Sequence, residues 1–310
     1  MKASALLSLC LFAASCSDPS SGDDVAADAG IDAHVGRPDG VALCYSAAAD
    51  AHAATTGFWT ALRAGDRGAR DAAIAALDAA TMAAPGEEEF HLLLGLAHLW
   101  RLAEPLPADN TPAIQLASVT AARDHLRRAY ELCPTDHRIA AWLGPILVRF
   151  GRAVNDPAMI AEGEAVLDRG IAHYPSFVLF SKLLIHADAP RDAPEFQQAL
   201  DAVLANGDAC SAVVDDPACA DHPRAAHNRE GGVVFFGDAL AKAGRRAEAE
   251  AIYRAAMAEP AWATWDYQSV LTERLATLDA RIAAYATPET TDDLEAAWAA
   301  ANQCALCHTD

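Results

Sequence analysis

The sequence predicts an all-α fold, built from stacked helical hairpins and closed by capping helices. Alanine is abundant and runs of aromatic or β-branched residues are few, which favours helix because alanine loses no side-chain entropy there. Prolines and glycines also recur at a fixed spacing through the middle of the chain. With 310 residues, of which 53% are hydrophobic, the chain is long enough to bury a sizeable core.

The charge balance excludes one class of partner. Forty-three acidic side chains against 23 basic ones give a formal net charge of −20, which repels nucleic-acid phosphates and anionic lipid headgroups. The acidic residues are spread along the predicted helix faces, a pattern typical of solvated positions. No serine-hydrolase, zinc-protease or phosphate-loop motif occurs. We therefore expect neither nucleic-acid binding nor hydrolytic chemistry.

Residues 1–15 have the pattern of a signal peptide for export. Lys2 is followed by an apolar stretch over residues 3–14, and small residues lead into Cys16. This stretch, AASC, resembles the bacterial lipobox, in which a peptidase cuts before a cysteine whose thiol carries a lipid. Ala13 stands where that family usually has leucine, which leaves a simple cut at the same small residues as the alternative. The resemblance implies a periplasmic or cell-envelope protein that is lipid-anchored at Cys16.

Residues 16–43 are predicted to form a disordered tether. They are rich in Asp, Ala, Gly and Ser and carry too little apolar surface to fold. No later apolar run approaches the roughly 18 to 20 residues that a membrane span requires. We therefore expect membrane association through the lipid anchor only.

Eight cysteines constrain the redox chemistry of the chain. They are Cys10, Cys16, Cys44, Cys133, Cys210, Cys219, Cys304 and Cys307. The first leaves with the signal peptide and the second carries the lipid, so six remain in an oxidising compartment to pair or to bind a cofactor. We expect a Cys210–Cys219 disulfide, since these two flank a short Asp-rich loop, and a Cys44–Cys133 disulfide by elimination. The number of cysteines left for pairing is even whether or not Cys304 and Cys307 are included, so the count does not decide the role of these two.

A repeated pattern lies within residues 44–260. Pro85 is followed ten residues later by Gly95, and Pro134 is followed ten residues later by Gly144. Small or apolar residues precede both prolines at matching distances, and a third window has a similar arrangement. The matching positions are Ala73, Leu77 and Ala80 before Pro85; Ala122, Leu126 and Ala129 before Pro134; and Phe236, Gly237, Leu240, Gly244, Ala249, Tyr253 and Ala256 before Pro260.

This pattern resembles the tetratricopeptide repeat, a helical hairpin of about 34 residues. Glycine and alanine allow two helices to approach closely, large residues fill the groove beside them, and proline ends the second helix. The resemblance implies a solenoid of five hairpins over residues 44–260. The fourth hairpin, from Phe177 to Asn206, is indicated by helical periodicity alone. Such a solenoid presents a concave surface that suits a protein partner.

Residues 261–310 are predicted to cap the stack. Apolar residues continue at helical spacing until Pro288 breaks the chain. A final helix is predicted from Thr291, because acidic residues follow it in the first turn, as a helix N-terminus prefers. This helix leads directly into the last motif of the sequence, QCALCHTD.

The spacing C-x-x-C-H, formed by Cys304, Cys307 and His308, is typical of a c-type haem attachment site. The two thiols add to the porphyrin vinyl groups, and the adjacent histidine becomes the proximal iron ligand. Two alternatives stay open. A local disulfide of the thioredoxin type would follow a strand, and no βαβ pattern precedes this motif. A zinc site would need a further ligand that the nearby sequence does not supply.

A sixth iron ligand would come from the upstream helices, since Thr309 and Asp310 are the only residues after the motif. At the hairpin edge to which the final helix returns, His227 and then Met257 are the preferred candidates, with His222 beside them. Earlier hairpins carry His91, His137 and His173 at the same edge, each further away. The aromatic residues that could shield the porphyrin are Trp262, Trp265, Tyr267 and Trp298. The alternatives are a solvated helix-start histidine, core packing by methionine and aromatics, and an open sixth position.

Two functions follow from these patterns. The first is an extracytoplasmic electron-transfer protein with one covalent haem c, whose repeat scaffold docks a redox or envelope partner. The second is a cofactor-free scaffold lipoprotein for protein–protein interaction, in which Cys304 and Cys307 form a disulfide. An electron carrier or scaffold is favoured over an enzyme. A haem peroxidase, the third interpretation, would need an open iron site and a nearby acid–base residue.

Overall fold

The computed structural model describes residue 44, residues 46–212 and residues 229–286. In this part of the chain the regular elements are helices and no strand occurs, which confirms the predicted all-α class. The α-helices are α2 (Ala47–Asp50), α3 (Ala53–Arg63), α4 (Arg70–Ala83), α5 (Glu88–Ala103), α6 (Pro112–Leu132), α7 (His137–Val154), α8 (Pro157–His173), α9 (Pro175–Leu184), α10 (Pro194–Ala212), α11 (Arg229–Lys242), α12 (Arg246–Met257), α13 (Gln268–Ala276) and α14 (Leu278–Ala284). Two short 3-10 helices, η2 (Pro107–Asp109) and η3 (Pro260–Thr264), lie in connections.

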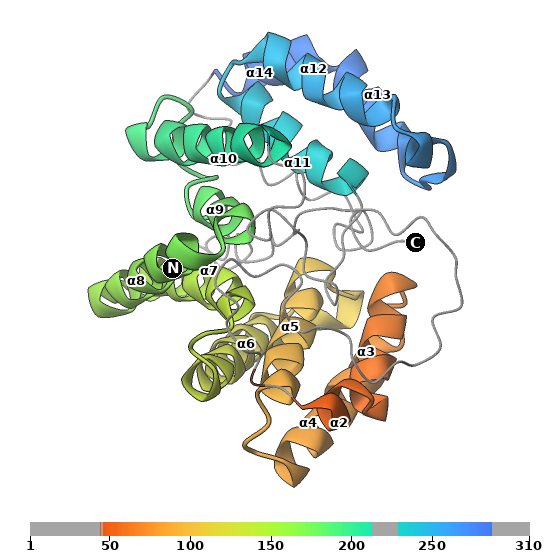
Figure 1. Ribbon diagram of the computed structural model, residues 1–310, viewed down its shortest axis with the longest axis vertical. Helices are drawn as coiled ribbons and strands as arrows, with labels where there is room; N and C mark the ends of the chain where they lie inside the picture. Colours follow the sequence, from red (N-terminus) through yellow and green to blue (C-terminus); the bar gives the residue numbers. More distant parts are fainter. Residues whose placement is uncertain (1–43, 45, 213–228, 287–310) are drawn as a thin grey trace.

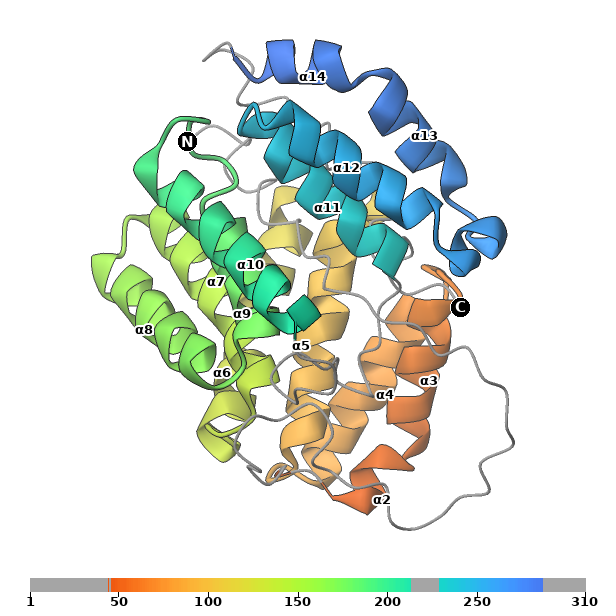
Figure 2. The same cartoon turned by 45° about the horizontal axis from the view of Figure 1, so that its top comes forward.

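Successive helices pack against one another, and the stack grows in chain order. The most extensive packing joins α5 to α6, α7 to α8 and α11 to α12. Contacts of α4 with α5, α6 with α7 and α8 with α9 connect neighbouring pairs. Along the longest axis in Figure 1, the helices run from α2–α4 at the orange end to α12–α14 at the blue end. Figure 2 shows α11 and α12 side by side at that end.

In three helix pairs a glycine of the first helix lies directly against a large side chain of the second. The contacts, with the distance from a Cβ added at the glycine to the nearest side-chain atom, are Gly95–Leu126 (2.7 Å), Gly144–Leu167 (2.4 Å) and Gly237–Tyr253 (2.0 Å). These distances are shorter than any that a Cβ atom normally makes, so each interface is shaped around a residue without a side chain. Glycine thus allows the close approach of the two helices in each pair.

Local polar signals determine where the central helices begin and end. The side chains of Thr111, Asp136 and Asp156 cap α6, α7 and α8 by accepting hydrogen bonds from backbone N–H groups of the first turn. Asn155 ends α7 in the left-handed conformation, with φ at 56°. This conformation reverses the chain in two residues, so that α8 returns directly along α7.

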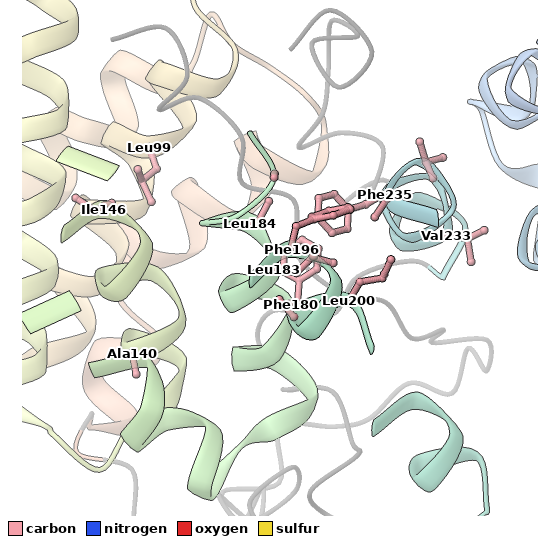
Figure 3. Packing of buried hydrophobic residues seen from close by; sticks show 14 of the residues in the cluster. Leu99, Ala140, Ile146, Phe180, Leu183, Leu184, Phe196, Leu200, Val233 and Phe235 are labelled. Carbon is pink, nitrogen blue, oxygen red and sulfur yellow. The ribbon is translucent and has the colours of Figure 1, made fainter. Parts of the chain in front are cut away.

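The largest buried cluster includes the residues that join α9 and α10 to α11. Figure 3 shows Phe180 and Leu183 of α9, Phe196 and Leu200 of α10, and Phe235 of α11 gathered in one region. The ring centroids of Phe180 and Phe235 are 4.5 Å apart. The segment from 177 to 206, which was indicated by helical periodicity alone, therefore forms two helices that share the core of their neighbours.

Two buried cations hold connections between helices against the stack. Lys242 of α11 is 1% exposed and donates hydrogen bonds to two backbone carbonyls of the α9–α10 connection. Arg70 of α4 is fully buried and donates to the backbone carbonyl of Glu104 at 2.8 Å and to the carboxylate of Asp109. Because Asp109 belongs to η2, the connection between α5 and α6 supplies the partner of a buried arginine.

The described C-terminal part forms a short cap on the last helix pair. η3, α13 and α14 follow α12, with Thr277 separating α13 from α14. α13 and α14 both pack against α11 and α12. Helices α13 and α14 therefore lie on the last helix pair, while the predicted final helix lies outside the described residues. None of the described helices has the length and apolar character of a membrane span.

Candidate functional site

The described residues contain only part of the predicted haem environment. Those outside the description are the signal peptide and tether (1–43) with the lipidation residue Cys16, the motif residues Cys304, Cys307 and His308, the candidate ligand His227, and also His222, Cys219 and Trp298. Cys210 lies in α10, but its side chain is outside the description, so the predicted Cys210–Cys219 disulfide stays a prediction. The other candidate ligand, Met257, lies within the described chain.

Met257 is the last residue of α12, and an aromatic corner follows it in the chain. Its side chain is partly exposed and packs against the main core cluster. The ring centroids of Trp262 and Trp265 are 5.8 Å apart, and those of Trp265 and Tyr267 are 5.9 Å apart. Trp265 is 5% exposed and belongs to the core itself. The three aromatic side chains therefore pack the corner between α12 and α13, and a role toward a porphyrin stays a prediction.

A disulfide joins the beginning of the helical stack to the end of α6. Cys44 and Cys133 are bonded, with their Cα atoms 5.7 Å apart, which confirms the pairing expected by elimination. Since disulfide sulfurs carry no hydrogen, the Thr135 hydroxyl donates to them, at 3.5 Å from the sulfur of Cys133. Nearby, the Ser46 hydroxyl donates to the Glu87 carboxylate at 2.8 Å. The bond and these contacts fix the point at which the predicted tether meets the stack.

A buried charge network lies at the same end of α5 and α7. Arg138 donates to Asp136 and, at 3.2 Å, to Glu89, and its guanidinium lies 4.0 Å from Glu88. All four residues are at most 4% exposed. Burial and the neighbouring Asp136 carboxylate raise the pKa of Glu88 well above its usual range, which favours the neutral acid. The expectation that acidic residues occupy solvated helix faces is wrong here, because tertiary pairing with one arginine makes their burial tolerable.

Three histidines meet between α5 and α6, and sequence reasoning did not single out this group. His91 Nδ1 and His125 Nδ1 are 3.1 Å apart, and His91 Nε2 is 3.3 Å from the backbone carbonyl of Pro85. The ring of His98 lies nearly parallel to that of His125, with centroids 6.4 Å apart. The sequence does carry a signal for this group: His91 and His98 are seven residues apart on one helix, and His125 precedes Leu126, which packs on Gly95.

The environment keeps this interhelical histidine cluster (His91, His98 and His125) uncharged. Burial, with a contribution from Arg101, lowers the pKa of His98 to about 4. Burial also lowers the pKa of His91, to which Arg128 contributes, and the pKa of His125, to which any charge on His91 contributes. At neutral pH the three rings are therefore neutral and stack as uncharged groups.

A second histidine pair lies at the edge shared by α7 and α8. The rings of His137 and His173 stack with centroids 4.6 Å apart and planes 5° from parallel. The sequence placed His91, His137 and His173 at one edge as remote candidates for iron ligation. Each of them instead has a histidine partner within its own helix pair, in α5–α6 or in α7–α8.

No group of three histidine, cysteine or acidic side chains among the described residues is arranged to hold a metal ion. No protein-family model, curated protein or solved structure matches this chain.

Proposed function

We propose that this chain is an exported, lipid-anchored c-type haem protein that transfers electrons and docks a redox or envelope partner through a tetratricopeptide-like scaffold. The observation that carries the proposal is the C-x-x-C-H spacing of Cys304, Cys307 and His308.

The scaffold part of the proposal is supported by the recurring glycine contacts. In α5–α6, α7–α8 and α11–α12 a glycine of the first helix meets a large residue of the second, and alanine or glycine flanks that residue at the same spacing. A repeat architecture accounts for this recurrence, since each hairpin buries its face only by stacking on neighbours. Five consecutive helix pairs, from α3–α4 to α11–α12, then form the solenoid.

Export is supported by the Cys44–Cys133 disulfide. Disulfides persist in oxidising compartments and are rare where glutathione and thioredoxin keep thiols reduced. Attachment of haem to cysteine thiols takes place on the same side of the membrane, so the disulfide and the motif favour one location. Cys16 is the proposed lipidation site, and residues 16–43 are the proposed tether between the membrane and the first helix.

The chemistry of the motif residues fits a covalent haem. Cys304 and Cys307 supply the two thioether links, and the imidazole of His308 supplies the proximal nitrogen ligand. The bound iron would supply one-electron exchange. His227 or Met257 is the proposed sixth ligand, and the Trp262–Trp265–Tyr267 corner, which follows Met257 in the chain, offers a nonpolar surface. The residues of this chain that surround the haem would then determine how far it is exposed to solvent and how closely a redox partner can approach it.

The absorption spectrum of the protein matured with a haem-attachment system tests the proposal. We expect a sharp Soret band that stays with the polypeptide after acid–acetone extraction. The matched control, Cys304→Ala with Cys307→Ala, should lose the band and keep its helical circular dichroism. A wild-type protein that is folded and exported but has no retained band would contradict the haem assignment and leave a cofactor-free scaffold lipoprotein.

A further inference from the structure

The interhelical histidine cluster is built so that its hydrogen bonding depends on protonation. A carbonyl oxygen only accepts, so His91 Nε2 carries the hydrogen that it donates to Pro85 at 3.3 Å. In neutral His91 the other nitrogen, Nδ1, is then an acceptor. The 3.1 Å contact between the two Nδ1 atoms therefore requires that His125 Nδ1 carries a hydrogen and donates it to His91.

Protons added to this arrangement have different consequences. The first can enter at His125 Nε2, which leaves the bond between the two Nδ1 atoms intact. Once His125 is protonated, a second proton on His91 Nδ1 would place two N–H groups face to face at a distance that only a hydrogen bond tolerates. His98 adds a third ring, whose buried Nδ1 has no hydrogen-bond partner among the described residues. Protonation there places a charged donor in a site without an acceptor.

The charged groups around the cluster come from three helices. Arg101 of α5 and Arg128 of α6 add positive charge that opposes protonation of His98 and His91. Asp78 of α4 and Asp124 of α6 act in the opposite direction on His125. The carboxylates therefore favour the first proton, on His125, and the arginines oppose further protons on the other two rings.

We propose that the interhelical histidine cluster is an acid-sensitive latch, which holds α5 against α6 when its rings are neutral and releases that contact when more than one ring is protonated. The latch lies between the two helices whose close approach is set by Gly95 against Leu126. Release would loosen α5 and α6, and through their contacts α4 and α7. The Cys44–Cys133 disulfide keeps the first helices joined to α6, so the loosened segment can reclose.

The direction of the pH effect follows from the shifted groups. In the folded protein the pKa of each of the three histidines lies below its value of about 6.5 in an unfolded chain. At a pH between the folded and the unfolded pKa, the unfolded state therefore binds more protons than the folded state. Stability from the cluster is therefore complete above about pH 6.5 and falls as the pH drops from about 6.5 toward the folded value of about 4 for His98.

Hydrogen exchange measured by mass spectrometry on the full mature protein at about pH 7 and about pH 5 tests the latch, after correction for intrinsic exchange chemistry. We expect the opening equilibrium of peptides from α5 and α6 to rise at least about tenfold more than that of peptides from α11 and α12. An equal change in both regions, or no change in α5 and α6, would overturn the proposal.

A variant separates the histidines from other acid-sensitive groups. His98→Leu keeps the volume and removes the titrating ring, so it should reduce the excess opening of α5 and α6 at acid pH by about tenfold. His173→Gln, on the exposed end of α8, should leave the excess unchanged. A folded His98→Leu protein with the wild-type pH response contradicts the proposal. If that variant does not fold, the wild-type comparison between the two regions decides.

Discussion

At the scale of the residue, the fold depends on positions where no side chain can be added. Gly144 is the clearest of them, because an added Cβ would meet Leu167 Cγ at 2.4 Å and the backbone carbonyl of Gly163 at 3.1 Å. The first neighbour is flexible, whereas the second is backbone and cannot move without shifting α8. The close contact of α7 with α8 therefore rests on this one missing methyl group.

A substitution at Gly144 tests that claim. Gly144→Ala gains about 1 kcal/mol of helix propensity but forces overpacking that costs about 1–3 kcal/mol, so we expect a lower free energy of unfolding in urea. The matched control is Gly57→Ala in α3, where nothing lies within 4 Å of an added Cβ. This control should be neutral or stabilising by up to about 1 kcal/mol. Equal effects at both positions would contradict close packing at Gly144.

Residue patterns in the sequence predicted part of this packing and missed another part. The spacing of Gly95, Leu126, Gly237 and Tyr253 relative to prolines was sufficient to identify these positions as packing residues, because a repeat places the same contact at the same position in each unit. The buried acidic residues were missed, since Glu88 looks like any acidic residue at a helix start. Its burial depends on Arg138, which lies fifty residues later in the chain, and no local pattern reports such a pair.

At the scale of the element, one buried carboxylate attaches the cap to the last helix pair. Asp238 of α11 accepts a hydrogen bond from the Tyr253 hydroxyl at 2.6 Å. It also pairs with Arg274 of α13 at 3.1 Å and with Arg281 of α14 at 2.7 Å. Four helices thus meet at a side chain that is 1% exposed. The sequence predicted the cap from apolar spacing but not this network, nor the break at Thr277.

Removing the charge of Asp238 should loosen the cap. We expect Asp238→Asn to lower the free energy of unfolding by about 3–5 kcal/mol, because it breaks buried ion pairs while their arginines stay in place. The control is Asp279→Asn, which removes an exposed partner of Arg246 and should change stability by less than about 1 kcal/mol. Urea denaturation of both variants measures the difference, and a small effect at Asp238 would contradict the assigned role.

The disulfide is the second attachment at this scale. Cys44 and Cys133 are 89 residues apart, so their bond closes a long loop in the unfolded chain. We expect Cys44→Ala with Cys133→Ala to lower the free energy of unfolding by about 2–4 kcal/mol, with amide protection lost first in α2 and α3. Mapping of peptides under non-reducing conditions supplies the control, since it must show the two cysteines linked in the wild type. Unchanged stability would contradict a structural role for this bond.

At the scale of the whole molecule, the scaffold is described by the structure, whereas the haem site is predicted from the sequence. The described helices form one continuous stack from α2 to α14, with shared cores and close glycine contacts. The candidate site was predicted from a short motif, and motif chemistry is local, so the sequence alone names Cys304, Cys307 and His308. The distal ligand depends on which side chains the fold brings to the iron, which no spacing along the chain reports.

The histidine latch is independent of the haem, and each proposal survives the failure of the other.

The intact mass of the mature polypeptide, produced in a host that attaches haem and exports the protein, is the most direct measurement of the central claim. We predict the mass of the chain cut before Cys16, plus its lipid and one covalently bound haem, with the haem mass absent from the Cys304→Ala, Cys307→Ala variant. A wild-type protein that carries the lipid and lacks the haem mass would contradict the assignment.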